Sequence, residues 1–136
     1  MGYPNRTINR GPDVSFTADP DGSAIPAYTR CQFKAPVVPL LSGKPVIEPC
    51  DANERADVIT NEPIAAGSEG ACFFANTGGE VYGVCNGAIP NAAPVYGAAS
   101  GEVSASSGGG AVLCGKATTQ GYDNKVVTYS LTATAA

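Results

Sequence analysis

Histidine and tryptophan are absent from this 136-residue sequence, and methionine occurs once. Without histidine, neither a Ser-His-Asp nor a Cys-His nucleophile system can be built, and a zinc-hydrolase site that depends on imidazole is excluded as well. Long apolar runs are also missing, because no stretch approaches the roughly 18 residues that a membrane span needs. The first residues lack the apolar core of a secretory signal, and we therefore expect synthesis in the cytoplasm and no membrane partner.

Positive charge is scarce and scattered. Lys and Arg together number eight, against 12 Asp and Glu, which leaves a formal net charge of -4. A surface that binds phosphates needs clustered Lys and Arg side chains, and the sequence holds no such cluster. Nucleic acid is therefore not an expected partner.

Large side chains are few within the apolar fraction. Hydrophobic residues make up 43% of the chain, but aromatic residues only 7%. The length suits one domain with a single core, and a core of Ala and Val buries modest apolar area per residue. The free energy gained by burying such a core exceeds the entropic cost of ordering the chain by a small margin. We therefore expect stabilising contacts with partner chains.

Residues that interrupt helices are abundant, with 17 Gly and 11 Pro. Short runs of Val, Ile, Tyr, Phe and Thr lie between Gly, Pro, Asn or Asp, a pattern typical of strands joined by tight turns. This pattern predicts an all-β protein with a compact small β-barrel or β-sandwich-like domain. At most one short helix is expected, at 52–57, after Asp51 as a helix cap.

The composition changes at about residue 26. Residues 1–26 are polar and rich in Pro and Asp, and we predict an extended N-terminal arm there. Within it Val14, Phe16 and Ala18 alternate with polar residues, which favours a short strand, either free or added to another chain's sheet. Residues 27–136 form the predicted β-domain. Its expected strands are Thr29–Phe33, Val37–Leu41, Val46–Pro49, Val58–Ile59, Gly70–Ala75, Glu80–Val84, Pro94–Gly97, Ala111–Ala117 and Lys125–Thr132.

The cysteines are widely spaced and odd in number, and no two form a Cys-x-x-Cys pair. This spacing does not suit zinc. In a cytoplasmic product we expect buried free thiols that act as small apolar side chains. The five are Cys31, Cys50, Cys72, Cys85 and Cys114.

The remaining catalytic designs use carboxylates or a cysteine. Five acids lie in turn-like surroundings without a matching second group, as expected of solvated turn residues: Asp19, Asp21, Asp51, Glu54 and Asp57. Cys85, beside Asn86-Gly87 at a strand end, is the best candidate nucleophile, but no base lies near it in the sequence. We therefore expect no enzymatic activity, no cofactor and no bound metal.

Several segments between Val37 and Leu131 follow one another in a characteristic order. These segments are Ala65–Gly70, Ile89–Tyr96, Ala99–Val103, Ala111–Ala117 and the strand Val126–Leu131. In this order they resemble the small head decoration, or cement, proteins of tailed bacteriophages. The resemblance covers most of the chain.

The resemblance implies a β-tulip-like domain that clusters, usually as homotrimers, on the outer surface of the virion's capsid. Its partner would be the major capsid protein, and its role would be to stabilise contacts between capsomers without catalysis. An extended arm suits this role, because a strand added to a sheet edge gains main-chain hydrogen bonds. The residues that we expect to contact the capsid are Tyr3, Arg6, Ile8, Arg10, Val14 and Phe16.

A second interpretation is a carbohydrate-binding or adhesive β-module displayed on a virion or fibre surface. Sugar binding of this kind uses a platform of exposed aromatic rings. The candidates in the domain are Tyr82, Tyr96, Tyr122 and Tyr129. Because tryptophan is absent, core and rim packing is the more ordinary role for these side chains.

Overall fold

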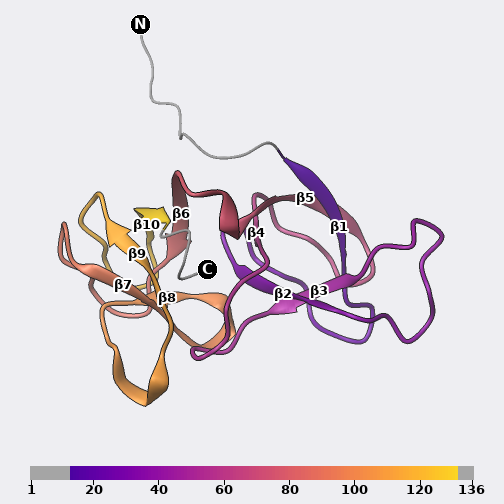
Figure 1. Cartoon of the computed structure of the whole chain (residues 1–136), viewed down its shortest axis with the longest axis horizontal. Helices are drawn as coiled ribbons and strands as arrows, with labels where there is room; N and C mark the ends of the chain where they lie inside the picture. The colour runs from indigo at the N-terminus through magenta and orange to yellow at the C-terminus, as the bar shows by residue number, and fades with distance from the viewer. Residues whose placement is uncertain (1–12, 132–136) are drawn as a thin grey trace, which may run out of the picture.

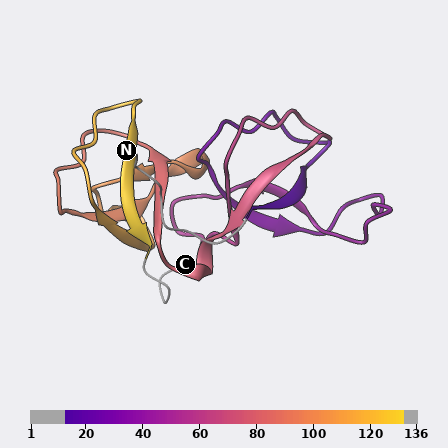
Figure 2. The same ribbon diagram turned by 90° about the horizontal axis from the view of Figure 1, so that it is seen from above.

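The computed structural model describes residues 13–131 and consists almost entirely of β-strands. Two five-stranded sheets lie side by side along the long axis of the molecule, one from each half of the chain (Figures 1 and 2). The predicted all-β class is confirmed. The described residues contain no α-helix, and the short helical turns are 3-10 turns: η1 (Ala75–Thr77), η2 (Ala99–Gly101) and η3 (Gly108–Gly110).

The first half forms a closed barrel, which we call barrel 1, with strand order β1-β3-β2-β4-β5. Its strands are β1 (Val14–Ala18), β2 (Arg30–Lys34), β3 (Val46–Pro49), β4 (Val58–Thr60) and β5 (Glu69–Phe74). The β1–β3 pair is parallel and the other four pairs are antiparallel. Closure leaves barrel 1 without an open sheet edge.

The second half forms a sheet with strand order β6-β10-β9-β7-β8. Its strands are β6 (Glu80–Val84), β7 (Pro94–Gly97), β8 (Val103–Ser104), β9 (Leu113–Ala117) and β10 (Val126–Leu131). A parallel bridge between Cys85 and Val103 joins the two outer strands, and Asn86 N donates to Val103 O at 2.7 Å. The sheet therefore closes at this point, and we call it barrel 2.

The two barrels have the same topology. We number the five strands of each barrel in chain order. In both barrels the first strand lies between the third and the fifth, and the second strand lies between the third and the fourth. The first and third strands are parallel in both, while every other pair is antiparallel. The chain is thus an internal repeat of one five-stranded unit.

The register of the pairs is the same as well. Val14 pairs with Cys72 in barrel 1, and Val81 pairs with Tyr129 in barrel 2. Outside the strands, an antiparallel Ile25–Ile64 bridge has its counterpart in an Ile89–Gly121 bridge. Each of these first isoleucines precedes a proline, and three residues later a non-glycine residue is left-handed in both halves: Tyr28 (φ 65°) and Ala92 (φ 67°).

At one pair of matched core positions, the large and the small side chain are in opposite places in the two barrels. In barrel 1, Ile64 fills the space over Gly70, where a Cβ would lie only 2.5 Å from Ile64 Cγ1. In barrel 2 the sizes are reversed, because Gly121 stands where Ile64 does and Val127 where Gly70 does. Interiors are close-packed, so that a large side chain on one strand requires a small one opposite.

The buried residues form two clusters. One lies within barrel 1, around Phe16 and Ile47. The larger one fills barrel 2 and continues into barrel 1 through Cys50, Ile59 and Phe73. The expectation of a single core was therefore wrong in detail, because two barrels are joined through one shared cluster.

Most predicted strands match observed ones, but Val37–Leu41 does not. This run lies in the connection between β2 and β3 and forms no strand. Pro36 and Pro39 lack the N–H groups that a ladder needs, which explains the difference. The predicted helix at 52–57 is also wrong, because these residues form turns and bends.

The described part of the predicted arm, residues 13–26, is built into barrel 1. Strand β1 pairs with β3 on one side and with β5 on the other. Ile25 then joins Ile64 through two hydrogen bonds of 2.8 Å. The alternation around Phe16 predicted a strand correctly, but the strand pairs within its own chain.

Candidate interaction surfaces

The residues predicted to contact a capsid divide into two groups. Tyr3, Arg6, Ile8 and Arg10 lie outside the described residues. Val14 is half-buried, and Phe16 is only 6% exposed in the core of barrel 1. The Phe16 ring lies 4.9 Å from the ring of Phe33 and is therefore not available for a pocket on a partner.

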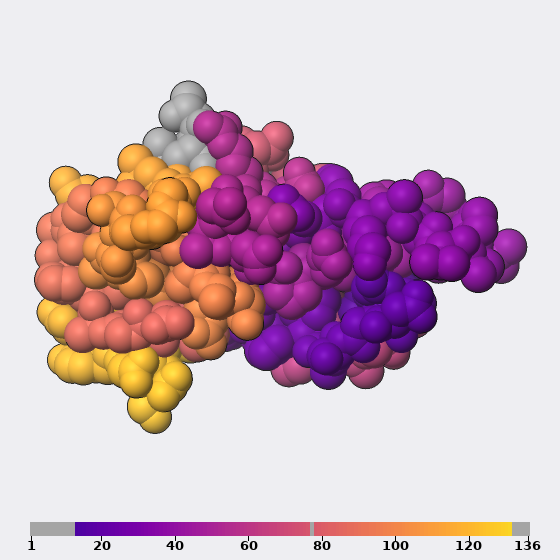
Figure 3. Space-filling view, turned by 90° about the horizontal axis from the view of Figure 1, so that it is seen from below, coloured from indigo at the N-terminus to yellow at the C-terminus, as the bar shows by residue number. Residues whose placement is uncertain are grey.

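The connection between β2 and β3, residues 35–45, projects from one end of the molecule, and we call it the apolar loop (Figures 1 and 3). Val37, Val38 and Leu41 are 82%, 75% and 110% exposed. The loop contains no acidic residue and one basic residue, Lys44. Apolar side chains gathered at such a projection are typical of a contact with another protein.

The base of the apolar loop is held against β1. Lys44 Nζ donates to Ser15 O at 2.7 Å and lies 5.0 Å from the centre of the Phe16 ring. The chain reverses at Gly43, whose N–H donates to Leu40 O at 3.0 Å and whose φ of +73° suits glycine. The loop therefore projects from an anchored base.

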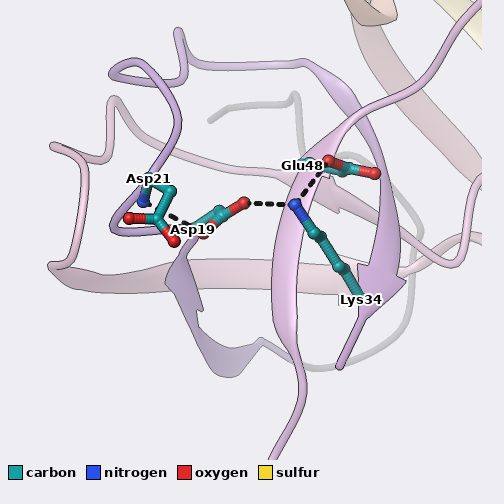
Figure 4. A network of polar contacts seen from close by, with 4 residues as sticks. All are labelled: Asp19, Asp21, Lys34 and Glu48. Atoms are coloured by element: carbon teal, nitrogen blue, oxygen red, sulfur yellow. Dashed lines mark hydrogen bonds and ion pairs between the residues drawn. The ribbon is translucent and has the colours of Figure 1, made fainter. Parts of the chain in front are cut away.

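A small ionic network lies where β2 leads into the apolar loop (Figure 4). Lys34 Nζ donates to Asp19 Oδ2 at 2.8 Å and lies 3.6 Å from Glu48 Oε1. Asp21 N also donates to Asp19 Oδ1 at 3.0 Å. The hydrogen bond from Lys34 is the main cause that lowers the pKa of Asp19, and the same bond raises the pKa of Lys34.

The two barrels meet through the connection between β7 and β8 and through Val112, which immediately precedes β9. Gly101 N donates to Cys50 O at 2.8 Å, and Val112 N donates to Ala52 O at 3.0 Å. A Cβ on Gly101 would lie 2.5 Å from Arg30 O, so that only glycine fits this approach. The barrels are therefore in close contact.

Arg30 is buried at this contact, with 2% of its surface exposed. Its Nη2 donates to the backbone oxygen of Glu54. Its Nη1 and the hydroxyl of the fully buried Tyr129 find no hydrogen-bond partner among the described residues. Both side chains line a cavity of about 10 Å³, and burial raises the pKa of Tyr129. A cavity of this size holds one water molecule at most.

All five cysteines are free and buried, as the sequence predicted. Burial raises the pKa of Cys50 and of Cys72 to about 12, and it also raises the pKa of Cys85. Since the thiolate is the reactive form, these thiols are poor nucleophiles at neutral pH. The environment of Cys85, which is fully buried, opposes the role of an accessible nucleophile.

The four tyrosines of the proposed sugar platform have different environments. Tyr129 is a core residue with no exposed surface, and Tyr122 is 63% exposed. Tyr82 is half-buried, with its ring 5.1 Å from that of Tyr28, and Tyr96 is also half-buried. Tyr129 therefore has no part in a surface platform.

Two features are absent from residues 13–131. No group of three or more acidic or cysteine side chains is arranged to hold a metal ion there. In the same range, no helix has the length and the apolar character needed to cross a membrane.

The apolar loop and the internal repeat were not foreseen from the sequence. The loop was mistaken for a strand, although its prolines argue against one. The repeat has a short signal in the sequence, because Ala24-Ile25-Pro26 recurs as Ala88-Ile89-Pro90. Three residues are too few to reveal a repeat whose register becomes visible only in the pairing.

No protein-family model matches the chain, and no curated protein matches it either. A solved structure does: the head fiber gp8.5 N base of bacteriophage phi29, with a TM-score of 0.66 and 15% sequence identity. The likeness covers 90% of this chain and 96% of that one. At this identity it shows a shared fold, which is that of a bacteriophage head protein.

Proposed function

We propose that this chain is a structural protein of a bacteriophage virion. The observation that carries the proposal is the fold, which is shared with the base of a phage head fiber over nearly the whole length of both chains. The order of sequence segments independently resembles head decoration proteins. The proposed role is decoration of the outer surface of the head, with the major capsid protein as partner and with homotrimers as the bound form.

We propose that this role involves no catalysis. The chain has no histidine to act as a general base. Its thiols are buried, and burial raises their pKa values, which keeps them protonated at neutral pH. Both observations support a protein that acts by binding.

The proposed contact with the shell lies in residues 1–12. This segment holds Tyr3, Arg6, Ile8 and Arg10, a mixture of aromatic, basic and apolar side chains that is common in interface hot spots. Phe16 is withdrawn from the proposed contact, because its ring is buried in barrel 1.

Co-sedimentation with undecorated heads of the phage that encodes the chain tests the proposal. The full chain should bind and saturate, and a chain lacking residues 1–12 should bind at least tenfold more weakly. A deletion through residue 26 is unsuitable, because it removes β1 and opens barrel 1.

A double variant, Arg6→Ala with Arg10→Ala, narrows the contact further. Its matched control is Arg55→Ala, which changes an exposed arginine on barrel 1. The double variant should weaken binding and the control should not. A full chain that does not bind heads at any concentration refutes the proposed function.

A further inference from the structure

The contact between the barrels uses a different surface of each one. Barrel 2 contributes the connection from Ala98 to Glu102, which follows β7. Barrel 1 contributes Thr29 and Arg30, at the start of β2, together with the chain after β3, where Cys50 accepts from Gly101. Ala56 of barrel 1, which is 8% exposed, belongs to the shared buried cluster.

Because the barrels are repeats in the same register, each of these surfaces has a counterpart on the other barrel. The connection 98–102 joins β7 to β8, and its counterpart joining β2 to β3 is the apolar loop. Phe33, which pairs with Ile47, occupies the position of Gly97, which pairs with Val103. We call Phe33 and the apolar loop the loop end of barrel 1.

The second counterpart lies on barrel 2. Pro94 occupies the position of Arg30, since Arg30 pairs with Ile59 and Pro94 pairs with Lys116. Leu113 lies two residues before Gly115, as Ala56 lies two before Val58, and a register shift in barrel 2 brings Leu113 opposite Tyr96. We therefore take Leu113 as the counterpart of Ala56 by its place in the chain. We call Pro94 and Leu113, with residues 105–111 between β8 and β9, the open end of barrel 2.

Exposed apolar side chains gather at these two counterparts. Of the seven large apolar side chains that are exposed in the described part of the chain, five lie there. Phe33, Val37, Val38 and Leu41 belong to the loop end, and Leu113, which is 41% exposed, belongs to the open end. The residues at the matching positions of the contact between the two barrels, Gly97 and Ala56, are buried.

The length of the apolar loop is not needed to close a barrel. Barrel 2 joins the matching strands through the five residues 98–102, whereas barrel 1 uses 35–45. The additional residues carry the most exposed large apolar side chains of the described chain, Val37, Val38 and Leu41. Their exposure therefore serves something other than the closure of barrel 1.

We propose that copies of this chain associate head to tail, with the loop end of barrel 1 packed on the open end of barrel 2 of the next copy. The contact between copies continues the contact that already joins the two barrels within one chain. It joins two different surfaces, and the assembly therefore keeps one free loop end and one free open end, at its two termini, unless it closes into a ring. A second copy is the occupant that the repeat itself specifies.

Three variants of the full chain test the proposal in analytical ultracentrifugation over a concentration series. The loop variant carries Val37→Ser and Leu41→Ser, and the open-end variant carries Leu113→Ser. The matched control is Val126→Ser, since Val126 is 46% exposed but lies at neither end. All four positions are exposed in the single chain, and circular dichroism of each variant checks that it folds.

The wild-type chain and the control should self-associate with the same dissociation constant. The loop variant and the open-end variant should each associate about tenfold or more weakly, because each loses buried apolar side chains from one surface. Mixed in equal amounts, these two variants should form a one-to-one dimer, since one intact surface of each kind remains.

Three results would overturn the proposal: a wild-type chain that stays monomeric at all concentrations, a loop variant that associates like the wild type, or mixed variants that form no dimer. The proposal does not depend on binding to phage heads. The sedimentation of the chain alone and its co-sedimentation with heads therefore fail or succeed separately.

Discussion

Two alanine substitutions, compared with each other, test how tightly the two barrels pack against one another. Gly101 and Gly43 both have a φ of +73°, so that alanine meets the same backbone cost at either position. Their surroundings differ. A Cβ on Gly101 would collide with Thr29 and would lie 2.5 Å from Arg30 O, whereas a Cβ on Gly43 meets nothing within 4 Å.

The left-handed backbone costs alanine about 1–2 kcal/mol. Gly43→Ala should therefore lower the free energy of unfolding by about that amount. Gly101→Ala adds the cost of forcing a methyl group into a packed contact, about 1–3 kcal/mol. The expected loss for Gly101→Ala is thus about 2–5 kcal/mol.

Urea unfolding followed by circular dichroism measures both losses, and comparison of the slopes checks that unfolding remains a single transition. Equal losses for the two variants would refute the close contact between the barrels. A larger loss for Gly43→Ala would contradict the open surroundings of the apolar loop.

Three further predictions concern the core, the thiols and the ionic network. Phe16→Ala should lower the free energy of unfolding by about 3–5 kcal/mol, measured by urea unfolding, because it removes a buried ring from barrel 1. Burial raises the pKa of Cys50 and Cys72 to about 12, so the stability that their protonated thiols provide is present below the ordinary thiol pKa and is lost as the pH rises toward 12. Urea unfolding should accordingly show lower stability at pH 10.5 than at pH 8, and replacement of both by alanine should reduce the difference. Lys34→Met should raise the pKa of Asp19 toward its ordinary value, as followed by carboxyl NMR, and an unchanged pKa would contradict the hydrogen bond between them.

Local patterns in the sequence were sufficient to predict most strands. The alternation of Val127, Tyr129 and Leu131 with polar residues predicted β10, and its inward residues are buried or half-buried. Buried free cysteines followed from their spacing and the expected compartment, and the structure confirms them. These features depend on residues that are close together in the chain.

Features that depend on distant residues were missed. Phe16 was placed on a free arm because nothing near it in the sequence shows β5, its pairing partner more than fifty residues later. The run at Val37 and Val38 has the apolar composition of a strand, but the flanking Pro36 and Pro39 argue against one, and the closure of barrel 1 without this run shows that it is a loop. The capsid contact proposed for Tyr3, Arg6, Ile8 and Arg10 remains a prediction.

The repeat also determines the order in which the chain can fold during synthesis. All pairings of barrel 1 join residues between Val14 and Phe74, so this barrel can close before the second half has been made. In that interval the cluster that contains Ile59 and Phe73 is incomplete, because most of its members belong to barrel 2. Translation therefore produces a folded half with a temporarily exposed apolar surface, and the following half of the same chain is positioned to cover it.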